Sequence, residues 1–184
     1  FNHVVAENDM KWQLIHPRAG NEGYDFTGAD ALAQFAKDNA LELAGHTLVW
    51  HSQTPNWVFE GTHRPEPEQG GQDEKPINNN EPSANTAQGT NDAPAAPGEQ
   101  GNRPRRGPGG FPGFRGFDLN GPRASREELL QRMRDHIHTV VGRYKGQVKV
   151  WDVVNEAVSD GGDEVLRRSP WSVIIGPDFI AKAF

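Results

Sequence analysis

Three groups of polar and aromatic side chains follow apolar stretches of this 184-residue chain, and together they have the chemistry needed to bind a sugar. The first group follows an apolar run that ends at Ala6, the second lies around the end of residues 41–50, and the third closes residues 146–157. Sugar hydroxyls need several hydrogen-bond donors and acceptors in fixed places, and the face of a pyranose ring packs well against an indole. The residues that supply these groups are Glu7, Asn8, Lys11, His46, Trp50, His51, Gln53, Asn155 and Glu156.

Each group is expected to stand at the end of a β-strand. The apolar run before Glu7 turns abruptly polar, as a buried strand does on leaving a sheet. Residues 41–50 carry Leu, Val and Trp at the density of a strand and are followed by a polar loop. Residues 146–157 are apolar on both faces, which is typical of a parallel strand covered by helices.

Helices are predicted between and after these strands. Thr27 and Asp30 form a candidate capping box for a helix that ends near Asn39, with Leu32, Phe35 and Ala36 on one face. Ser125 and Glu128 form another capping box before a longer helix, and a further helix is expected from Asp178 onward. The alternation of strands and helices predicts a parallel α/β architecture, either a barrel or an open sheet. The remaining tryptophans are expected to pack in the core, namely Trp12, Trp57, Trp151 and Trp171.

Residues 61–123 interrupt this alternation. Most of the 21 glycines and 14 prolines of the chain fall here, with no apolar periodicity. Such a stretch cannot bury enough apolar surface to offset a backbone ordering cost of about 1 to 2 kcal/mol per residue. We therefore predict a disordered insert over 61–123, between two ordered segments at 1–60 and 124–184. Its Arg- and Phe-containing end is interpreted as a solvated tether.

The composition argues against several classes of partner. A formal net charge of -6 disfavours nucleic acid or an anionic membrane surface, and no apolar run approaches the roughly 20 residues of a membrane span. The chain has no cysteine, and the spacing of its histidines at 3, 46 and 51 fits no common metal-ligand pattern. No metal or other cofactor is therefore predicted. The start at Phe1 shows no signal-peptide pattern, and we expect it to lie within a fold.

The segments AENDMKW, GHTLVWHSQTPNW and WDVVNEA resemble successive signature segments of the family 10 endo-β-1,4-xylanases, with HIHTVVGRYKG between the last two. The resemblance covers nearly everything outside the insert. It implies a partial (β/α)₈ TIM barrel, roughly its second to fourth β/α units. Such a barrel needs about 250 residues, so its remaining strands would have to complete it. The resemblance also implies a secreted, periplasmic or cell-surface protein.

The same resemblance implies a retaining glycoside hydrolase that cleaves internal bonds of xylan or xylo-oligosaccharides. Glu156 would be the general acid that protonates the glycosidic oxygen and then the base that activates water. Asn155 would hold the 2-hydroxyl of the cleaved sugar, and Asp152 would support the nucleophile through a histidine on a later strand outside this chain. The other implied sugar-binding residues are Glu7, Asn8 and Lys11 on the glycone side, His46 and Gln53 near the cleaved residue, and Trp50 in the pocket.

One half of the catalytic pair is missing from the sequence. Retaining hydrolysis needs two carboxyl groups about 5 to 5.5 Å apart, and the nucleophile of the family lies on a later strand. None of the carboxylates after Glu156 matches its motif, so we expect this chain by itself to be inactive. Two alternatives stay open, because fold alone does not determine the substrate. One is a xylan-binding protein without catalysis, and the other is a related hydrolase of another β-glycan.

Overall fold

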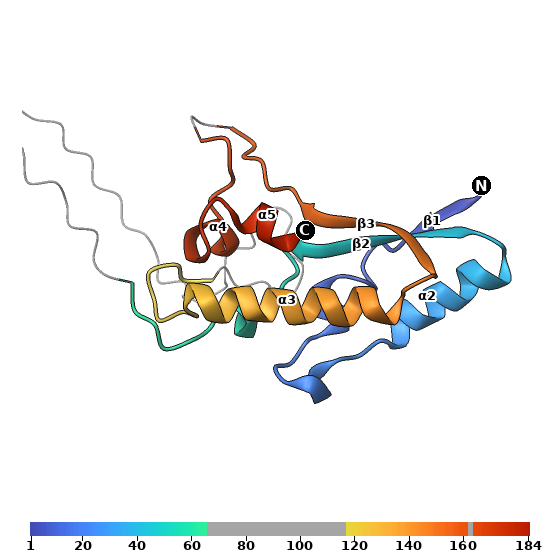
Figure 1. Ribbon diagram of the computed structural model, residues 1–184, viewed down its shortest axis with the longest axis horizontal. Coiled ribbons are helices and arrows are strands. Elements are labelled where there is room, and N and C mark those ends of the chain that lie inside the picture. Colours follow the sequence, from blue (N-terminus) through green and yellow to red (C-terminus); the bar gives the residue numbers. More distant parts are fainter. Residues whose placement is uncertain (66–116, 162–163) are drawn as a thin grey trace, which may run out of the picture. The chain divides into compact units, whose positions relative to one another are not determined.

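Three parallel strands form a single sheet in the computed structural model, which describes residues 1–65, 117–161 and 164–184 (Figure 1). The strands are β1 (His3–Val5), β2 (Glu42–Trp50) and β3 (Val148–Asn155), and they lie side by side in chain order. β1 pairs with the start of β2, and β2 pairs with β3 as far as the Trp50–Asn155 pair. The predicted parallel α/β architecture is confirmed, and the carboxyl ends of β2 and β3 meet at one edge of the sheet.

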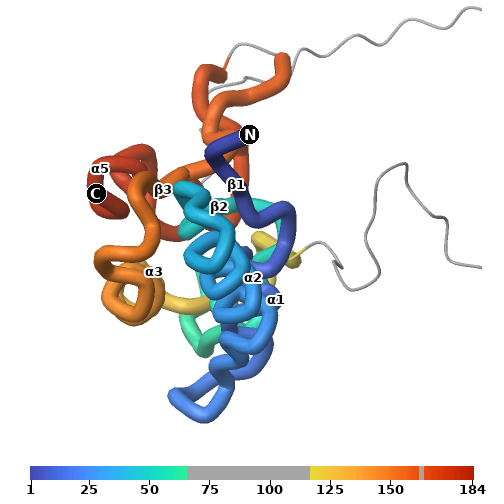
Figure 2. The backbone as a smooth tube through the Cα atoms, turned by 90° about the vertical axis from the view of Figure 1, so that its right-hand side faces the viewer, coloured from blue at the N-terminus to red at the C-terminus, as the bar shows by residue number. Residues whose placement is uncertain are grey.

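Helices occupy both connections between the strands. The chain from β1 to β2 contains α1 (Trp12–Ile15) and α2 (Thr27–Asp38), and the chain from β2 to β3 contains α3 (Arg126–Arg143). Both α2 and α3 lie on the same side of the sheet, as the two perpendicular views agree (Figures 1 and 2). The face of α2 that is buried consists of alanines, which let a helix approach a sheet closely. The core residues from these elements are Ala29, Ala33, Ala36, Leu43, Leu48, Val49, Leu129, Met133 and Val140.

The start of α3 has the local structure that its sequence predicts. The Ser125 hydroxyl accepts from the backbone N–H of Glu128 at 3.2 Å, and the Glu128 carboxylate accepts from the N–H of Ser125 at 2.8 Å. This reciprocal capping box satisfies two N–H groups that the helix itself leaves without a partner. A cap of this kind stabilises a helix by about 1 kcal/mol. The capping box predicted at residue 125 is confirmed.

The capping box predicted for α2 is wrong. Phe26 is the N-cap residue and makes no side-chain cap, while the Asp25 carboxylate accepts from the N–H of Thr27 at 3.0 Å. Asp30 turns away from the helix start because Arg143 on α3 holds its carboxylate, with hydrogen bonds of 2.9 and 2.5 Å. A tertiary ion pair therefore displaces the local interaction. Phe35 also departs from the predicted buried face, since 52% of its surface is exposed.

Two short helices follow β3. α4 (Pro170–Ile174) was not predicted, although Ser169 caps it and Pro170 occupies its first turn, where a missing N–H does no harm. α5 (Phe179–Ala183) confirms the helix expected after Asp178. Trp12 and Trp171 are buried as predicted and their rings are in contact, with centroids 5.6 Å apart. Among the described residues, no helix is long and apolar enough to cross a lipid bilayer.

The two ends of the predicted insert lie next to each other. His63 and Arg123 exchange backbone hydrogen bonds of 2.9 and 2.8 Å, and the N–H of Ala124 donates to the carbonyl of Phe59 at 2.8 Å. Residues 61–65 and 117–123 therefore belong to the ordered unit. The prediction of disorder otherwise concerns residues 66–116, which lie outside the described residues.

Candidate active site

Glu156 follows the last residue of β3 and lies beside the end of β2. The strand register sets Trp50 opposite Asn155, so the indole of Trp50 reaches Glu156, the residue that directly follows β3. Its Nε1–H donates to Oε2 of Glu156 at 3.0 Å, and Nε2 of His51 lies 4.0 Å from the same oxygen. About half of the Glu156 side chain, 52%, remains exposed. The carboxyl group is thus held by one neighbour and still open to a ligand.

The backbone of Glu156 is in an unusual conformation. Its φ angle is 51°, in the left-handed region that residues with a side chain seldom adopt. That conformation costs about 1 to 2 kcal/mol relative to the right-handed one, and it persists only where surrounding contacts hold it. Such outliers gather at functional sites, and this one lies at the residue for which the resemblance implies the acid/base role.

Two hydrogen bonds hold the backbone carbonyl group of Trp50 in place. The Trp50 carbonyl oxygen accepts from the Thr54 hydroxyl at 2.7 Å and from Nε1 of Trp171 at 3.0 Å. Trp171 comes from α4 and is fully buried, so it offers a rigid support. These two hydrogen bonds orient the residue whose indole holds Glu156.

Lys11 connects the first group of polar residues to the other two. Its Nζ donates to Oδ1 of Asn8 at 3.0 Å and lies 4.8 Å from the centre of the Trp50 ring. Only 7% of Lys11 is exposed. Burial lowers the pKa of Lys11, and the negative charges of Glu7 and Glu156 act in the opposite direction. Carboxylates that follow two different strands, β1 and β3, therefore act on the Lys11 ammonium group.

His46 and Asp152 form a second pair, one from β2 and one from β3. Nδ1 of His46 lies 2.9 Å from Oδ2 of Asp152, and the Thr47 hydroxyl donates to the Asp152 carbonyl at 2.8 Å. The resemblance implied that Asp152 acts through a histidine on a later strand outside this chain. In the structure the carboxylate of Asp152 contacts His46 of this chain, because the parallel register sets the two residues opposite each other.

Some of the predicted site residues contact one another in the structure, and others do not. The structure brings Asn8, Lys11, Trp50 and Glu156 into one contacting set and His46 and Asp152 into a pair. Glu7, Gln53 and Asn155 lie on the same three segments, but within the described residues their side chains make no hydrogen bond to another predicted site residue. Gln53 is buried, and its carbonyl oxygen accepts from the N–H of Gln13 at 2.9 Å.

Two residues near Glu156 had been given no individual role: His51, which was named only as a polar residue at a strand end, and Arg167, which was not named at all. His51 adjoins Trp50 in the sequence, so its place at a strand end was a usable signal. Burial lowers the pKa of His51 first, the charge of Arg167 lowers it further, and Glu156 and Asp160 oppose these effects. Arg167 is eleven residues after Glu156 and reaches it because residues 165–167 pair with residues 157–159, with the N–H of Arg167 donating to the Ala157 carbonyl at 2.8 Å. No local pattern could have indicated that contact.

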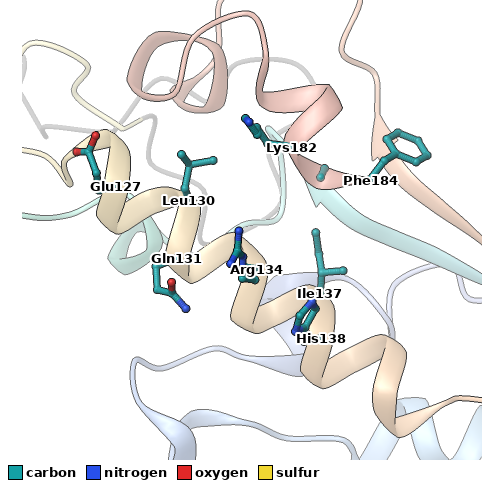
Figure 3. A pocket seen from close by; sticks show the side chains of 9 residues that line it. Glu127, Leu130, Gln131, Arg134, Ile137, His138, Lys182 and Phe184 are labelled. Carbon is teal, nitrogen blue, oxygen red and sulfur yellow. The ribbon is translucent and has the colours of Figure 1, made fainter.

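The described residues also form a groove outside this site. It lies between α3 and α5, has a volume of about 680 Å³, and is lined by residues such as Leu130, Arg134 and Lys182 (Figure 3). None of the predicted site residues lines it. Within residues 1–65, 117–161 and 164–184, no group of three or more His, Asp or Glu side chains is arranged to hold a metal ion.

A sequence model of glycosyl hydrolase family 10 matches residues 1–74 and 117–184 of the chain. The chain belongs to glycosyl hydrolase family 10. The three strand ends described above carry the segments on which the resemblance of the sequence to this family rested. Residues 75–116, which fall within the predicted insert, lie outside the match.

Relatives in family 10 cover the chain completely. A beta-1,4-xylanase of Dictyoglomus thermophilum is 35% identical over 184 residues, which are all of this chain and 34% of the relative. Endo-1,4-beta-xylanase B of Paenibacillus barcinonensis is 34% identical over the whole chain and 38% of its own length. The chain thus spans little more than a third of these two family 10 proteins.

Solved structures of the family have the same fold. A crystal structure of a Paenibacillus barcinonensis xylanase with a conduramine derivative matches at a TM-score of 0.64 and 34% identity, over all of this chain and 38% of that one. A mutant in complex with xylotriose matches at a TM-score of 0.64 and 33% identity, over 38% of its chain. The three-stranded parallel sheet with its helices is accordingly part of a family 10 (β/α)₈ barrel, as predicted.

Proposed function

We propose that the whole protein is a retaining endo-β-1,4-xylanase in which Glu156 is the general acid/base. The single observation that supports this most strongly is the Glu156 carboxyl group at the strand ends, held at 3.0 Å by the Trp50 indole and half exposed. The xylanase names of the family 10 relatives support the substrate class. A solved structure of a relative in complex with xylotriose supports a xylo-oligosaccharide as the ligand.

Glu156 would act twice in the reaction. As an acid it protonates the glycosidic oxygen while the bond to the sugar breaks, and as a carboxylate it later takes a proton from the attacking water. The Trp50 N–H donates to Oε2, which leaves the other oxygen of the carboxyl group to carry the proton. A group that is half exposed can meet both the leaving sugar and the incoming water.

The polar residues around Glu156 would bind the sugar on either side of the bond. Lys11 has three N–H donors and one of them bonds to Asn8, so two can serve sugar hydroxyls, with Glu7 as a nearby acceptor. His46 is hydrogen-bonded to the Asp152 carboxyl group through Nδ1, so its Nε2 would serve a sugar hydroxyl. Asn155 would bind the 2-hydroxyl, and Gln53 would contribute near the cleaved residue.

The nucleophile would come from a part of the barrel beyond these 184 residues. Asp160 and Asp178, which follow Glu156, are paired with Arg167 and Arg126 at 2.7 Å. A carboxylate that forms an ion pair with a guanidinium is a poor nucleophile, because its oxygen lone pairs already accept hydrogen bonds from the guanidinium. The remaining barrel strands are therefore part of this proposal.

The test uses the whole protein and its Glu156→Gln variant on xylan. The unmodified protein should release reducing ends, and ¹H NMR should show the β-anomer forming first, because two displacements retain the configuration. Glu156→Gln should lower turnover by about 10²–10⁴ fold, since that is the usual contribution of general acid–base catalysis. Initial formation of the α-anomer, or full activity in the variant, would contradict the mechanism.

The same assay separates the two alternative functions. Retention of the protein on insoluble xylan without any release of reducing ends would favour a binding protein. Faster cleavage of another β-glycan than of xylan would favour a hydrolase of that glycan. Matched initial rates on soluble xylan and soluble cellulose derivatives measure this preference directly.

We also propose that the protein works outside the cytoplasm, because xylan is a polymer that would be cut before uptake. The family does not determine the compartment, since a relative of Thermoanaerobacterium saccharolyticum is described as an intracellular xylanase. Activity measured in separated culture medium, cell surface and cytoplasm tests the proposal, and activity confined to the cytoplasm would overturn it.

A further inference from the structure

Glu156 needs a contact that keeps its backbone in the left-handed conformation. The structure provides one from Arg167, whose Nε donates to the Glu156 carbonyl oxygen at 3.0 Å. The second arm of the same guanidinium donates to Oδ2 of Asp160 at 2.7 Å. Only 23% of the Arg167 side chain is exposed, compared with 84% of Asp160. The planar guanidinium therefore joins the backbone of Glu156 to a surface carboxylate.

The loop that carries Arg167 is itself tied to the residue after Glu156. The N–H of Arg167 donates to the Ala157 carbonyl at 2.8 Å, and the N–H of Ser159 donates to the Val165 carbonyl at 2.9 Å. Val158 and Leu166 form an isolated antiparallel bridge within the same loop. Side chain and backbone of Arg167 thus hold the two consecutive peptide groups that follow the Cα of Glu156, and the first of these sets the backbone conformation on that side of Glu156.

We propose that Arg167 is a positioning residue for the acid/base, which holds the Glu156 carbonyl so that the carboxyl group stays in reach of the Trp50 indole. This inference rests on the proposed function. Arg167 bonds to the backbone of Glu156 and acts through that residue. Without it, the backbone at Glu156 can relax to a right-handed conformation, which redirects the side chain. A misplacement of about 1 Å at a catalytic group can slow a reaction by about a hundredfold.

The positive charge of Arg167 also affects His51, the other neighbour of the Glu156 carboxyl group. Nε2 of His51 lies 4.0 Å from the Glu156 carboxylate, and a protonated His51 would compete for it. Burial lowers the pKa of His51, and Arg167 adds to that effect. A neutral His51 leaves the carboxyl group free to take up and release the proton that catalysis requires.

The experiment compares three variants of the whole protein. Arg167→Met keeps the length of the side chain and removes every donor. Arg167→Lys keeps the charge, but its single nitrogen cannot reproduce the two-armed contact with Glu156 and Asp160. Arg168→Met is the matched control, because Arg168 is the exposed neighbour and undergoes the same chemical change.

Two aryl xylobiosides with a poor and a good leaving group provide the first readout. Arg167→Met should lower kcat about a hundredfold on the poor leaving group and less than tenfold on the good one, with KM nearly unchanged. Arg167→Lys should fall between Arg167→Met and the unmodified protein, and it keeps the test available if Arg167→Met does not fold. Arg168→Met should behave as the unmodified protein does.

The Trp50 indole N–H resonance in a ¹⁵N-labelled sample provides the second readout, assigned by its loss in Trp50→Phe. It reports the hydrogen bond to Glu156 directly, so it should shift in both Arg167 variants and stay in place in Arg168→Met. Equal losses of kcat on both leaving groups, or an unshifted Trp50 resonance, would overturn the positioning role while leaving the proposed function intact. An unmodified protein that cleaves neither substrate would overturn the proposed function and the role of Arg167 with it.

Discussion

His136 should make the stability of the fold depend on pH below neutrality. Only 1% of this residue is exposed, and its ring stacks on Trp12 with centroids 3.7 Å apart and an angle of 2° between the planes. Within the described residues, neither ring nitrogen has a hydrogen-bond partner. Burial lowers the pKa of His136 well below its usual value, and the charge of His16 lowers it further. The folded protein therefore holds His136 neutral.

The sign and size of the effect follow from proton linkage. The unfolded chain binds a proton at His136 near pH 6.5 and the folded chain does not, so stability is complete above that pH and is lost as the pH falls below it. Below pH 6.5 the free energy of unfolding falls by about 1.36 kcal/mol for each pH unit, as long as the pH stays above the pKa of His136 in the folded protein. Lowering the pH from 7 to 5 should therefore reduce the free energy of unfolding by about 2 kcal/mol.

His136→Phe should abolish this contribution. The phenyl ring can keep the stacking on Trp12, and it removes two buried nitrogens without partners, so the variant should be at least as stable at pH 7. Urea unfolding of the whole protein at several values between pH 5 and 7 measures the difference. Exposed His138 on the same helix offers a matched control, and His138→Gln should leave the pH dependence unchanged. An equal loss of stability between pH 7 and 5 in His136→Phe and in the unmodified protein would refute the reasoning.

Three further predictions concern the fold. Asp30→Asn should lower the free energy of unfolding by about 1 kcal/mol in denaturant titrations at pH 7, because it weakens a half-exposed bidentate pair with Arg143 that solvent screens in part. Asp25→Asn, which weakens one local hydrogen bond, should cost less, and an equal loss would show that the tertiary pair adds nothing. Replacing residues 66–116 with a short Gly/Ser linker should change the Tm by no more than a few degrees, because His63 and Arg123 already pair and a short link can join them. A larger fall in scanning calorimetry would show that the replaced residues stabilise the barrel. Residues 1–184 expressed by themselves should release no reducing sugar from xylan and unfold without a sharp transition, since β1 and β3 have unpaired edges within the described sheet. Hydrolysis that depends on Glu156 would contradict this.

Elements with a strong local signal could be predicted from the sequence. The capping box at Ser125 and Glu128 was recognisable because both partners lie within one turn of the helix that they start. The three strands were recognisable because each of them carries several apolar, β-branched or aromatic residues within a short run. The capping box predicted at Thr27 and Asp30 was wrong because a distant residue competes for the Asp30 carboxylate. The spacing suited a cap, but Arg143, which is 113 residues away, binds the Asp30 carboxylate.

The sequence by itself determined the alternation of parallel strands and helices, because apolar periodicity is a local property. The resemblance of its strand-end motifs to family 10 then indicated a barrel and singled out Glu156 as the residue to examine. Only the tertiary structure decided how the site is assembled. Trp50 and Glu156 are 106 residues apart, as are His46 and Asp152, and each pair meets because β2 and β3 run parallel and are paired with each other. The contact of Arg167 with the Glu156 backbone depends on a loop that folds back on the strand end. A linear pattern carries no information about such contacts, since they arise only when the sheet and its loops have formed.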